Sequence, residues 1–413
     1  MVTRKRAAPL LMVSLLVASA AGSAACAAVL GFDRLSEEAA TEAGATEAST
    51  EASTEAGAPE AGPGCTALGL PDRPVPSSAG DAGPEAIHMA VKLFDFGIEQ
   101  TSQPSGFNLD RACSPTVATS TCATKIDEQT FAKYGKDHDD KGLDNAGFGL
   151  LGYLAYLGSA FSPKEINNRL QAGEFGAVLR LANWNGTNED EDVIVEVFPA
   201  IGVWNVPGGG GAPTPGGAPT FLPGDQWMRD RRFQNVVDAS RIKSANAWVT
   251  GGRLVASFQS VTLPVTVPDD KKPFDIIIQE GFLSGMLVVD GTSWKIEGGV
   301  LGGRWRTADM LAQARTIYVK DTIGLKNAVL CDPGLPAQAY AAVKKEVCDA
   351  RDIRGTSRDD GKGLPCDAFS TGLRVDTYAV VAPGPFADLP AIAARCEVDG
   401  SIPAGDDCAP AAP

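Results

Sequence analysis

The sequence predicts a mainly β protein: an antiparallel β-sandwich of jelly-roll type with helical insertions and disulfides, behind a disordered acidic N-terminal tether. Three observations predict this fold class. Runs of alternating apolar and polar residues recur in the middle of the chain, with turn residues between them. Helical segments interrupt these runs without the regular strand–helix alternation of a parallel sheet. Nine cysteines in 413 residues indicate cross-linking.

The strand predictions follow from period-2 alternation and β-branched residues. In the run 260–267 every second residue is apolar, and Pro264 indicates an edge position. Asp290-Gly291 between two alternating runs is typical of a type I′ hairpin turn, and Gly251-Gly252 predicts a second turn. Further strands are predicted at Ile87–Phe96, Val193–Val203 and Gly372–Val381.

The helix predictions rest on end signals. Ser162-Pro163-Lys164-Glu165 forms a capping box with a proline in the first turn, and Gly173 ends this helix. Phe148–Leu157 is apolar on every side, which favours a buried helix. Two more helices are predicted after the β-rich middle of the chain, at Thr307–Tyr318 and Pro336–Val347. Within that middle part, 207–224 is predicted to be a long Gly/Pro loop.

The N-terminus has the pattern of an export signal. Basic residues at 4–6 precede an apolar run to about Ala20, which is too short to favour a membrane-spanning helix. Ser23-Ala24-Ala25-Cys26 resembles a bacterial lipobox, with Ser23 where a leucine is usual, so residues 1–25 are predicted to be a signal peptide and Cys26 to carry a lipid. Simple secretion, with cleavage near the same small residues, is the alternative.

Residues 26–64 are predicted to be a disordered tether. The stretch 36–64 repeats Thr-Glu-Ala units and contains seven Glu without Lys, Arg or a large apolar residue, so it has nothing to bury and repels itself. The tether would hold one globular β-rich domain, 65–413, away from the membrane. An N-terminus without a role is the alternative.

Cysteine parity agrees with lipidation. If Cys26 is lipidated, an even number remains, as expected of a disulfide framework in an oxidising compartment. Cys113 and Cys122 lie close in sequence and are one candidate pair, and the other pairs stay open within a group crowded toward the C-terminus. The cysteines predicted to form disulfides are Cys65, Cys113, Cys122, Cys331, Cys348, Cys366, Cys396 and Cys408.

An acidic cluster at 137–145 is a candidate calcium site. Carboxylate and amide oxygens on a glycine-containing turn suit a hard cation. The order of residues departs from an EF-hand loop, because Lys141 replaces a donor and Phe148 stands where the bidentate Glu belongs. The alternative is a solvated turn in which Asp144 or Asn145 caps the next helix. The predicted ligands are Asp137, Asp139, Asp140, Asp144 and Asn145.

The segment 183–192 is a candidate ligand-binding surface. An exposed Trp beside amide and acidic groups resembles sugar-binding surfaces, in which the ring stacks on the saccharide. A polar turn between strands is the alternative, and the same carboxylates raise a third possibility, glycoside hydrolysis. The predicted residues are Trp184, Asn185, Asp190 and Asp192.

Composition argues against several classes of function. A net charge of −15 disfavours nucleic acid as a partner, because such binding depends on Lys and Arg. Two histidines leave little room for a histidine-dependent centre, and no GxSxG, HExxH or Walker motif is present. The run Gly147–Gly152 matches GxGxxG but follows an Asp-rich loop instead of a strand, so dinucleotide binding is not expected.

Several short segments together resemble predicted lipoproteins of myxobacteria, a family for which no activity is implied. The resemblance implies membrane anchoring and an extracytoplasmic location only. It is intermittent and rests on 29–33, Gly106–Asp110 with Cys113 and Cys122, Gly142–Asn145, Asn185–Thr187 and Gly299–Arg304.

These observations lead to an expected function at the cell envelope. The neutral Ala27 after Cys26 indicates the outer membrane or cell surface, with a periplasmic or secreted protein as the alternative. The expected role is non-enzymatic binding or structural work, calcium-assisted and directed at a glycan or an envelope protein. The rival hypothesis is an extracytoplasmic carboxylate-dependent hydrolase.

Overall fold

The computed structural model describes residues 68–75, 85–96, 105–114, 116–134, 142–157, 162–205, 217–234, 243–266, 273–314, 318–319, 328–330, 337–388 and 407–408. All of them belong to one compact unit, Pro59–Pro413. The predicted signal peptide 1–25, Cys26 and the tether 26–64 lie outside the described residues. Within the described part, no helix is long and apolar enough to cross a membrane.

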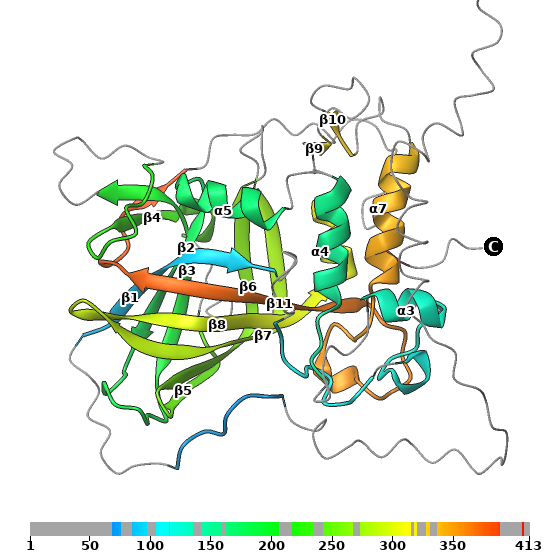
Figure 1. Cartoon of the computed structure of the whole chain (residues 1–413), viewed down its shortest axis with the longest axis horizontal. Coiled ribbons are helices and arrows are strands. Elements are labelled where there is room, and N and C mark those ends of the chain that lie inside the picture. Colours follow the sequence, from blue (N-terminus) through cyan, green and yellow to red (C-terminus); the bar gives the residue numbers. More distant parts are fainter. Residues whose placement is uncertain are drawn as a thin grey trace, which may run out of the picture. The chain divides into compact units, whose positions relative to one another are not determined.

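One sheet of ten strands dominates this unit (Figure 1). Its spatial order is β12-β4-β3-β2-β1-β11-β8-β7-β6-β5, and all neighbours are antiparallel except the parallel pair β12–β4. A two-stranded ribbon pairs β9 (Tyr318–Val319) with β10 (Ala328–Val329). The strands of the large sheet are β1 Ile87–Asp95, β2 Gly176–Ala182, β3 Ile194–Asn205, β4 Gln226–Asp230, β5 Asn246–Thr250, β6 Arg253–Thr266, β7 Pro273–Asp290, β8 Ser293–Arg306, β11 Ala368–Ala379 and β12 Phe386–Ala387.

The sheet curls until its β5 edge returns to the chain around β3. Asp190 and Val249 exchange both backbone hydrogen bonds, at 2.8 and 2.7 Å, and the Ser244 N–H donates to the Val195 carbonyl at 2.7 Å. The mainly β prediction with helical insertions is therefore confirmed, but the described strands form one curled sheet. Opposite walls of this curl face each other, whereas the predicted sandwich would have two separate sheets.

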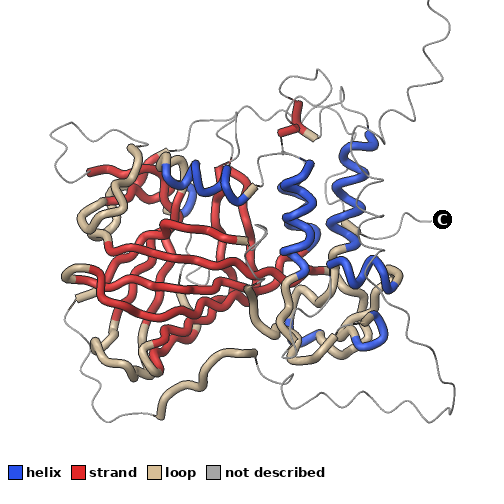
Figure 2. Tube along the Cα trace, in the orientation of Figure 1, coloured by secondary structure: helices blue, strands red, loops and turns tan. Residues whose placement is uncertain are grey.

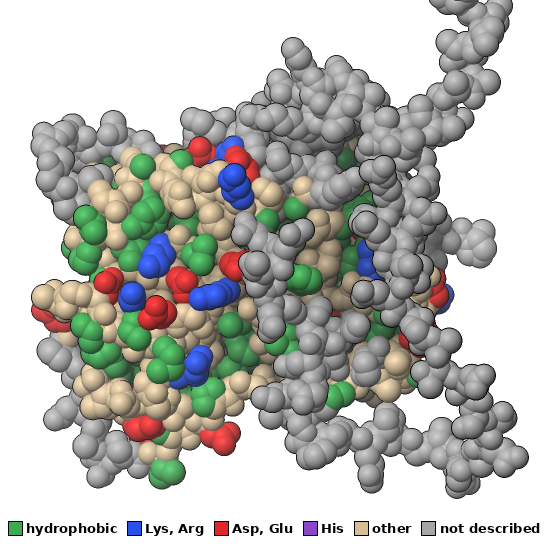
Figure 3. Space-filling model, viewed as in Figure 1, with side chains coloured by type: hydrophobic (Ala, Val, Ile, Leu, Met, Phe, Trp, Pro, Cys, Tyr) green, Lys and Arg blue, Asp and Glu red, His purple; other side chains and the backbone are tan. Residues whose placement is uncertain are grey.

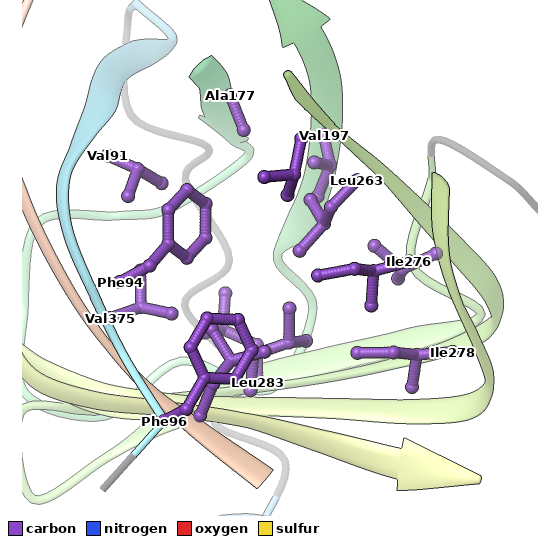
Figure 4. Packing of buried hydrophobic residues seen from close by; sticks show 14 of the residues in the cluster. Val91, Phe94, Phe96, Ala177, Val197, Leu263, Ile276, Ile278, Leu283 and Val375 are labelled. Carbon is purple, nitrogen blue, oxygen red and sulfur yellow. The ribbon is translucent and has the colours of Figure 1, made fainter. Parts of the chain in front are cut away.

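The inside of the curl is a packed apolar core. Figure 4 shows side chains from several strands, among them Phe94, Leu263, Ile276 and Leu283, pointing toward one another. The space left inside this part of the core is about 20 Å³, far below the roughly 300 Å³ of a small-molecule site. This part of the interior therefore stabilises the fold and is too small for a ligand of that size.

The helices α3, α4 and α7 gather at one end of the sheet (Figures 1 and 2), where α4 packs on β11 and contacts α3 and α7, whereas α5 packs on β1. α4 confirms the predicted apolar helix. In α7, Tyr340, Val343 and Val347 share one buried face as predicted. The helices are α3 Glu128–Tyr134, α4 Ala146–Leu157, α5 Pro163–Gln171, α6 Thr307–Ala314 and α7 Ala337–Asp349.

α5 has the predicted ends. The Ser162 hydroxyl accepts the Glu165 N–H at 3.1 Å, and Gly173 takes a φ of 73° just beyond the last turn. Asn167 of this helix bonds both the N–H and the carbonyl of Phe94 in β1, at 2.9 and 2.6 Å, and so fastens α5 to the sheet.

Both predicted hairpins are present, but one turn type was wrong. Gly251 and Gly252 have φ of 55° and 75°, as a type I′ turn requires. In the β7–β8 hairpin Asp290 pairs with Ser293, so the central residues are Gly291 and Thr292. Only Gly291 has a positive φ, 65°, which makes this a type II′ turn. The turn therefore lies one residue later than the predicted Asp290-Gly291, because Asp290 is the last residue of β7.

The position of Pro264 agrees in part with an edge position. β6 lies between β5 and β7 at its start, where β5 pairs with residues only as far as Ser257. Beyond that point β6 continues along β7, and Pro264 pairs with Asp275 there. The missing N–H of Pro264 is therefore accommodated on the side that β5 no longer covers.

Disulfide bonds are confirmed, with one pairing corrected. Cys122 bonds to Cys366 and Cys348 to Cys408, so the proposed Cys113–Cys122 pair is wrong. Backbone hydrogen bonds explain the long-range pairing, because Ala123 N–H donates to Leu364 and its carbonyl accepts Cys366 N–H, at 2.8 and 2.9 Å. Cys113 is also disulfide-bonded. The remaining predicted cysteines, Cys65, Cys331 and Cys396, lie outside the described residues.

Candidate functional site

The acidic cluster is only partly within the described residues. Asp137, Asp139 and Asp140 lie outside them. Asp144 is buried, and its Oδ2 accepts the N–H groups of Leu109 and Asp110 at 2.6 and 3.2 Å. Within the described ranges, no group of three or more His, Cys, Asp and Glu side chains could hold a metal ion.

Asn145 caps the helix α4, which is the alternative to metal binding for this residue. Its Oδ1 accepts the N–H of Phe148 at 3.0 Å, which caps α4, and also the N–H of Gly372 at 3.1 Å. Its Nδ2 donates to the carbonyls of Ser105 and Gly372. Asn145 thereby joins the 105–112 loop, α4 and β11.

The prediction of an exposed Trp184 was wrong. Only 6% of Trp184 is exposed, because its ring packs edge-on against Trp294 at 4.8 Å between centroids. Asp190 accepts the N–H groups of Asn185 and Asp192 at 2.7 and 3.1 Å. Together with the bridge from Asp190 to Val249, these bonds make the segment a structural turn that closes the curl, without a ring available for stacking on a sugar.

A pocket of about 310 Å³ lies elsewhere, where β7, β8, the 105–112 loop and the 351–367 segment meet. Gly106–Asp110 and Gly299–Arg304 each contribute lining residues, and Gly142–Asn145 supports them through Asp144. The lining residues are Leu68, Leu109, Asp110, Arg111, Glu280, Phe282, Arg304, Ser357, Arg358 and Asp360.

Arg304 in β8 is the centre of this pocket, and its side chain is 1% exposed. Its two terminal nitrogens meet the two oxygens of Asp360 at 2.9 and 2.6 Å, which is the bidentate geometry of a strong charge-assisted pair. The same nitrogens donate to the carbonyls of Arg354 and Leu109 at 2.8 and 2.7 Å. Burial raises the pKa of Asp360, and the pair with Arg304 opposes this rise.

Glu280 occupies a strained position beside Arg304. Its φ is 46° although it lies within β7, where the pairing with β8 shifts register between Gln279 and Phe282. Its carboxylate accepts the Thr356 hydroxyl and the Ser357 N–H, both at 2.9 Å, and lies 3.4 Å from Nε of Arg304. Bulges and strained backbone of this kind concentrate near functional sites, where they re-aim side chains.

Asp110 is the third acidic residue of the lining. Its oxygens accept the Ala112 N–H at 3.0 Å, the Ser114 hydroxyl at 3.2 Å and the Thr121 hydroxyl at 2.8 Å. Burial raises the pKa of Asp110 despite these bonds. The pocket thus contains a carboxyl group that holds its proton more tightly than a solvent-exposed Asp.

Asp352, in the 351–367 segment, is a further buried carboxyl group. Burial raises its pKa to about 7, and the nearby charge of Asp110 adds to this effect. The Ser370 N–H and hydroxyl donate to the two oxygens of Asp352, and the Ser370 hydroxyl oxygen accepts the first N–H of α4, on Ala146, at 2.8 Å. Asp352 therefore orders the junction of α4 with β11.

Most residues of this pocket were missed by sequence reasoning. A local signal existed only at Gln279-Glu280, which interrupts an apolar strand run with a charged residue. Ser357, Arg358 and Asp360 stand in a polar stretch without a motif. No protein-family model matches the chain, and comparisons with curated proteins and with solved structures found no match either.

Proposed function

We propose that this chain is an exported envelope lipoprotein, anchored through Cys26 and the tether 26–64, whose folded part binds a glycan in the pocket around Arg304. The observation that carries the proposal is the pocket itself. Its volume of about 310 Å³ falls within the range typical of small-molecule sites. The membrane anchor, the outer-membrane or surface location and any assistance by calcium belong to this proposal as well.

The lining has the two kinds of group that sugar recognition requires. Phe282 is partly exposed, and it provides an apolar surface for the C–H face of a sugar ring. Phe282 is held edge-on by Phe107 at 6.0 Å between centroids, which limits its motion. Arg111, Ser357 and Arg358 provide hydrogen-bond donors for hydroxyl groups at the same pocket.

Binding without cleavage agrees best with the state of the carboxylates. Asp360 directs both oxygens at Arg304, and Glu280 is engaged by Thr356, Ser357 and Arg304. Groups already held in this way are poorly placed to attack a substrate or to activate water. One observation favours the alternative of a carboxylate-dependent hydrolase: Asp110 has a raised pKa, as a general acid for glycoside hydrolysis would need.

The experiment is a glycan array followed by calorimetry on the bound glycans, with and without calcium. We expect Phe282→Ala to weaken binding at least tenfold, since the stacking surface is lost. Leu222→Ala is the matched control, because Leu222 is 61% exposed and does not line the pocket. Retained affinity in Phe282→Ala would contradict the assigned site, and chain-shortened products after incubation would favour the hydrolase.

A further inference from the structure

Two arginines of the lining are available to a ligand. Arg111 and Arg358 are exposed, and their guanidinium groups make no hydrogen bond or ion pair of 4 Å or less with any residue in the described ranges. The acidic neighbour of Arg358 is Asp359, whose pKa is lowered mainly by its hydrogen bond from Lys362 and less by Arg358. Both arginines therefore offer unused donors at the pocket.

The other charges of the pocket are already compensated. Arg304 is paired with Asp360 and Glu280, and Asp110 is surrounded by hydroxyl and N–H donors. The lining has three acidic and three basic residues, so it has no net formal charge. Figure 3 likewise shows acidic and basic side chains interspersed over one face of the molecule. Attraction of an anion would hence be local to Arg111 and Arg358.

The backbone of both arginines is held in place. Arg111 has a φ of 59°, and the next N–H, on Ala112, is bonded to the side chains of Asn108 and Asp110 at 3.1 and 3.0 Å. Arg358 lies in the short helix η5 (Ser357–Asp359), whose first N–H is bound by Glu280. Groups that are ordered before binding lose less entropy when a ligand arrives.

We propose that the ligand of this pocket is an acidic sugar, whose carboxylate, sulfate or phosphate group is bound by Arg111 and Arg358 while its ring lies on Phe282. This inference rests on the proposed function and narrows it to a class of glycan. Arginine suits the role because its planar donors bind the oxygens of such groups in pairs. The strained Glu280 then has a positioning role, since it fixes the turn that presents Arg358.

The test compares a panel of acidic oligosaccharides with their neutral counterparts, in which each carboxyl group has been reduced or methyl-esterified. Digalacturonate and its methyl ester are one such pair. We expect the acidic member to bind at least tenfold more tightly and added salt to weaken only its binding. Arg111→Gln and Arg358→Gln should each lower the affinity for the acidic member about tenfold and lower the affinity for the neutral member clearly less, because only the acidic member presents an anionic group to these side chains.

Arg374→Gln is the matched control, since Arg374 is exposed on β11 and does not line the pocket. Equal affinity for acidic and neutral members would overturn the inference and leave the proposed glycan binding intact. Failure to bind any glycan of either kind would overturn the proposed function as well. Inorganic sulfate and phosphate are added as competitors, and if either binds as tightly as the acidic oligosaccharides, the assignment to a sugar is overturned.

Discussion

Arg304 and Asp360 form a nearly solvent-free ion pair with Nη2 to Oδ2 at 2.6 Å, although 56 residues separate them in sequence. The pair joins the end of β8 to the segment after η5. Transferring the two charges of such a pair from water into the protein costs free energy, and removing one partner leaves the other charge buried and unpaired. It is therefore a determinant of local structure as well as of the pocket.

Loss of either partner should destabilise the fold. We expect Asp360→Ala to lower the free energy of unfolding by about 3 kcal/mol, because it leaves Arg304 buried without the carboxylate that both of its terminal nitrogens contact. The double variant Arg304→Met/Asp360→Ala should lose less than the sum of the two single variants. Urea denaturation of all four proteins measures this coupling. Additive losses would mean that the pair contributes no interaction energy.

Asp352 should make stability depend on pH. Its pKa is near 7 in the folded protein and about 4 when unfolded, so the folded state binds the proton more tightly. Its contribution is fully present below the unfolded pKa and is lost as pH rises through 7, by up to ~4 kcal/mol. Thermal unfolding from pH 4 to 8 should show this decline in wild type.

Asp352→Asn is the variant that checks the assignment, since Asn resembles the protonated acid in shape and charge. Its stability should change less between pH 4 and 7 than that of wild type. The stability of the variant should still depend on pH to some extent, because burial also raises the pKa of Asp110, Asp360 and Glu346. An identical pH profile for the two proteins would contradict the raised pKa of Asp352.

The Cys122–Cys366 bond should support ligand binding. It closes a loop with a sequence separation of 244 and fastens the segment that follows Asp360. We expect Cys122→Ala/Cys366→Ala to lose roughly 2–5 kcal/mol of stability and to bind ligand more weakly. Cys348→Ala/Cys408→Ala is the control. This pair closes a loop with a sequence separation of 60, and neither cysteine lines the pocket. Equal loss of affinity in both variants would contradict a specific role.

A second buried network should be sensitive to a single hydroxyl. The Tyr378 hydroxyl donates to Asp225 at 2.9 Å and accepts the Nε1–H of the fully buried Trp227 at 2.7 Å. Tyr378→Phe leaves that N–H without its acceptor, which should cost about 1–3 kcal/mol. Calorimetric unfolding measures the loss. Binding should be unchanged, because Tyr378 does not line the pocket; an unaltered melting temperature would contradict the network.

The lipid anchor is tested in cells. A clickable fatty acid should label the wild-type protein and not Cys26→Ala, since the thiol of Cys26 is the predicted attachment point. Ser23→Ala retains the cysteine and serves as a control that should still be labelled. Absence of label from the wild-type protein would overturn the anchoring proposal while leaving the pocket predictions untouched.

Local signals in the sequence predicted local structure well. Ser162 and Gly173 mark the two ends of a helix, as their capping chemistry requires, and the alternating runs form strands. The predictions for Trp184 and for the partner of Cys122 were wrong, because both depend on residues far away in the sequence. Trp184 looked available beside polar neighbours, yet Trp294, 110 residues later, covers it. Cys122 was paired with the nearest cysteine, whereas the fold aligned its segment with Cys366.

By itself, the sequence determined the mainly β character, the caps, the positions of the hairpins and the presence of disulfides, because periodicity, φ preference and hydrogen-bonding capacity act over a few residues. Only the tertiary structure decided that the sheet curls onto itself and that Arg304, Asp360, Glu280 and Asp110 line one pocket. These residues meet because strand register and chain crossings set their distances, and the favourable energy of a buried charge pair arises only after packing has removed the water around it.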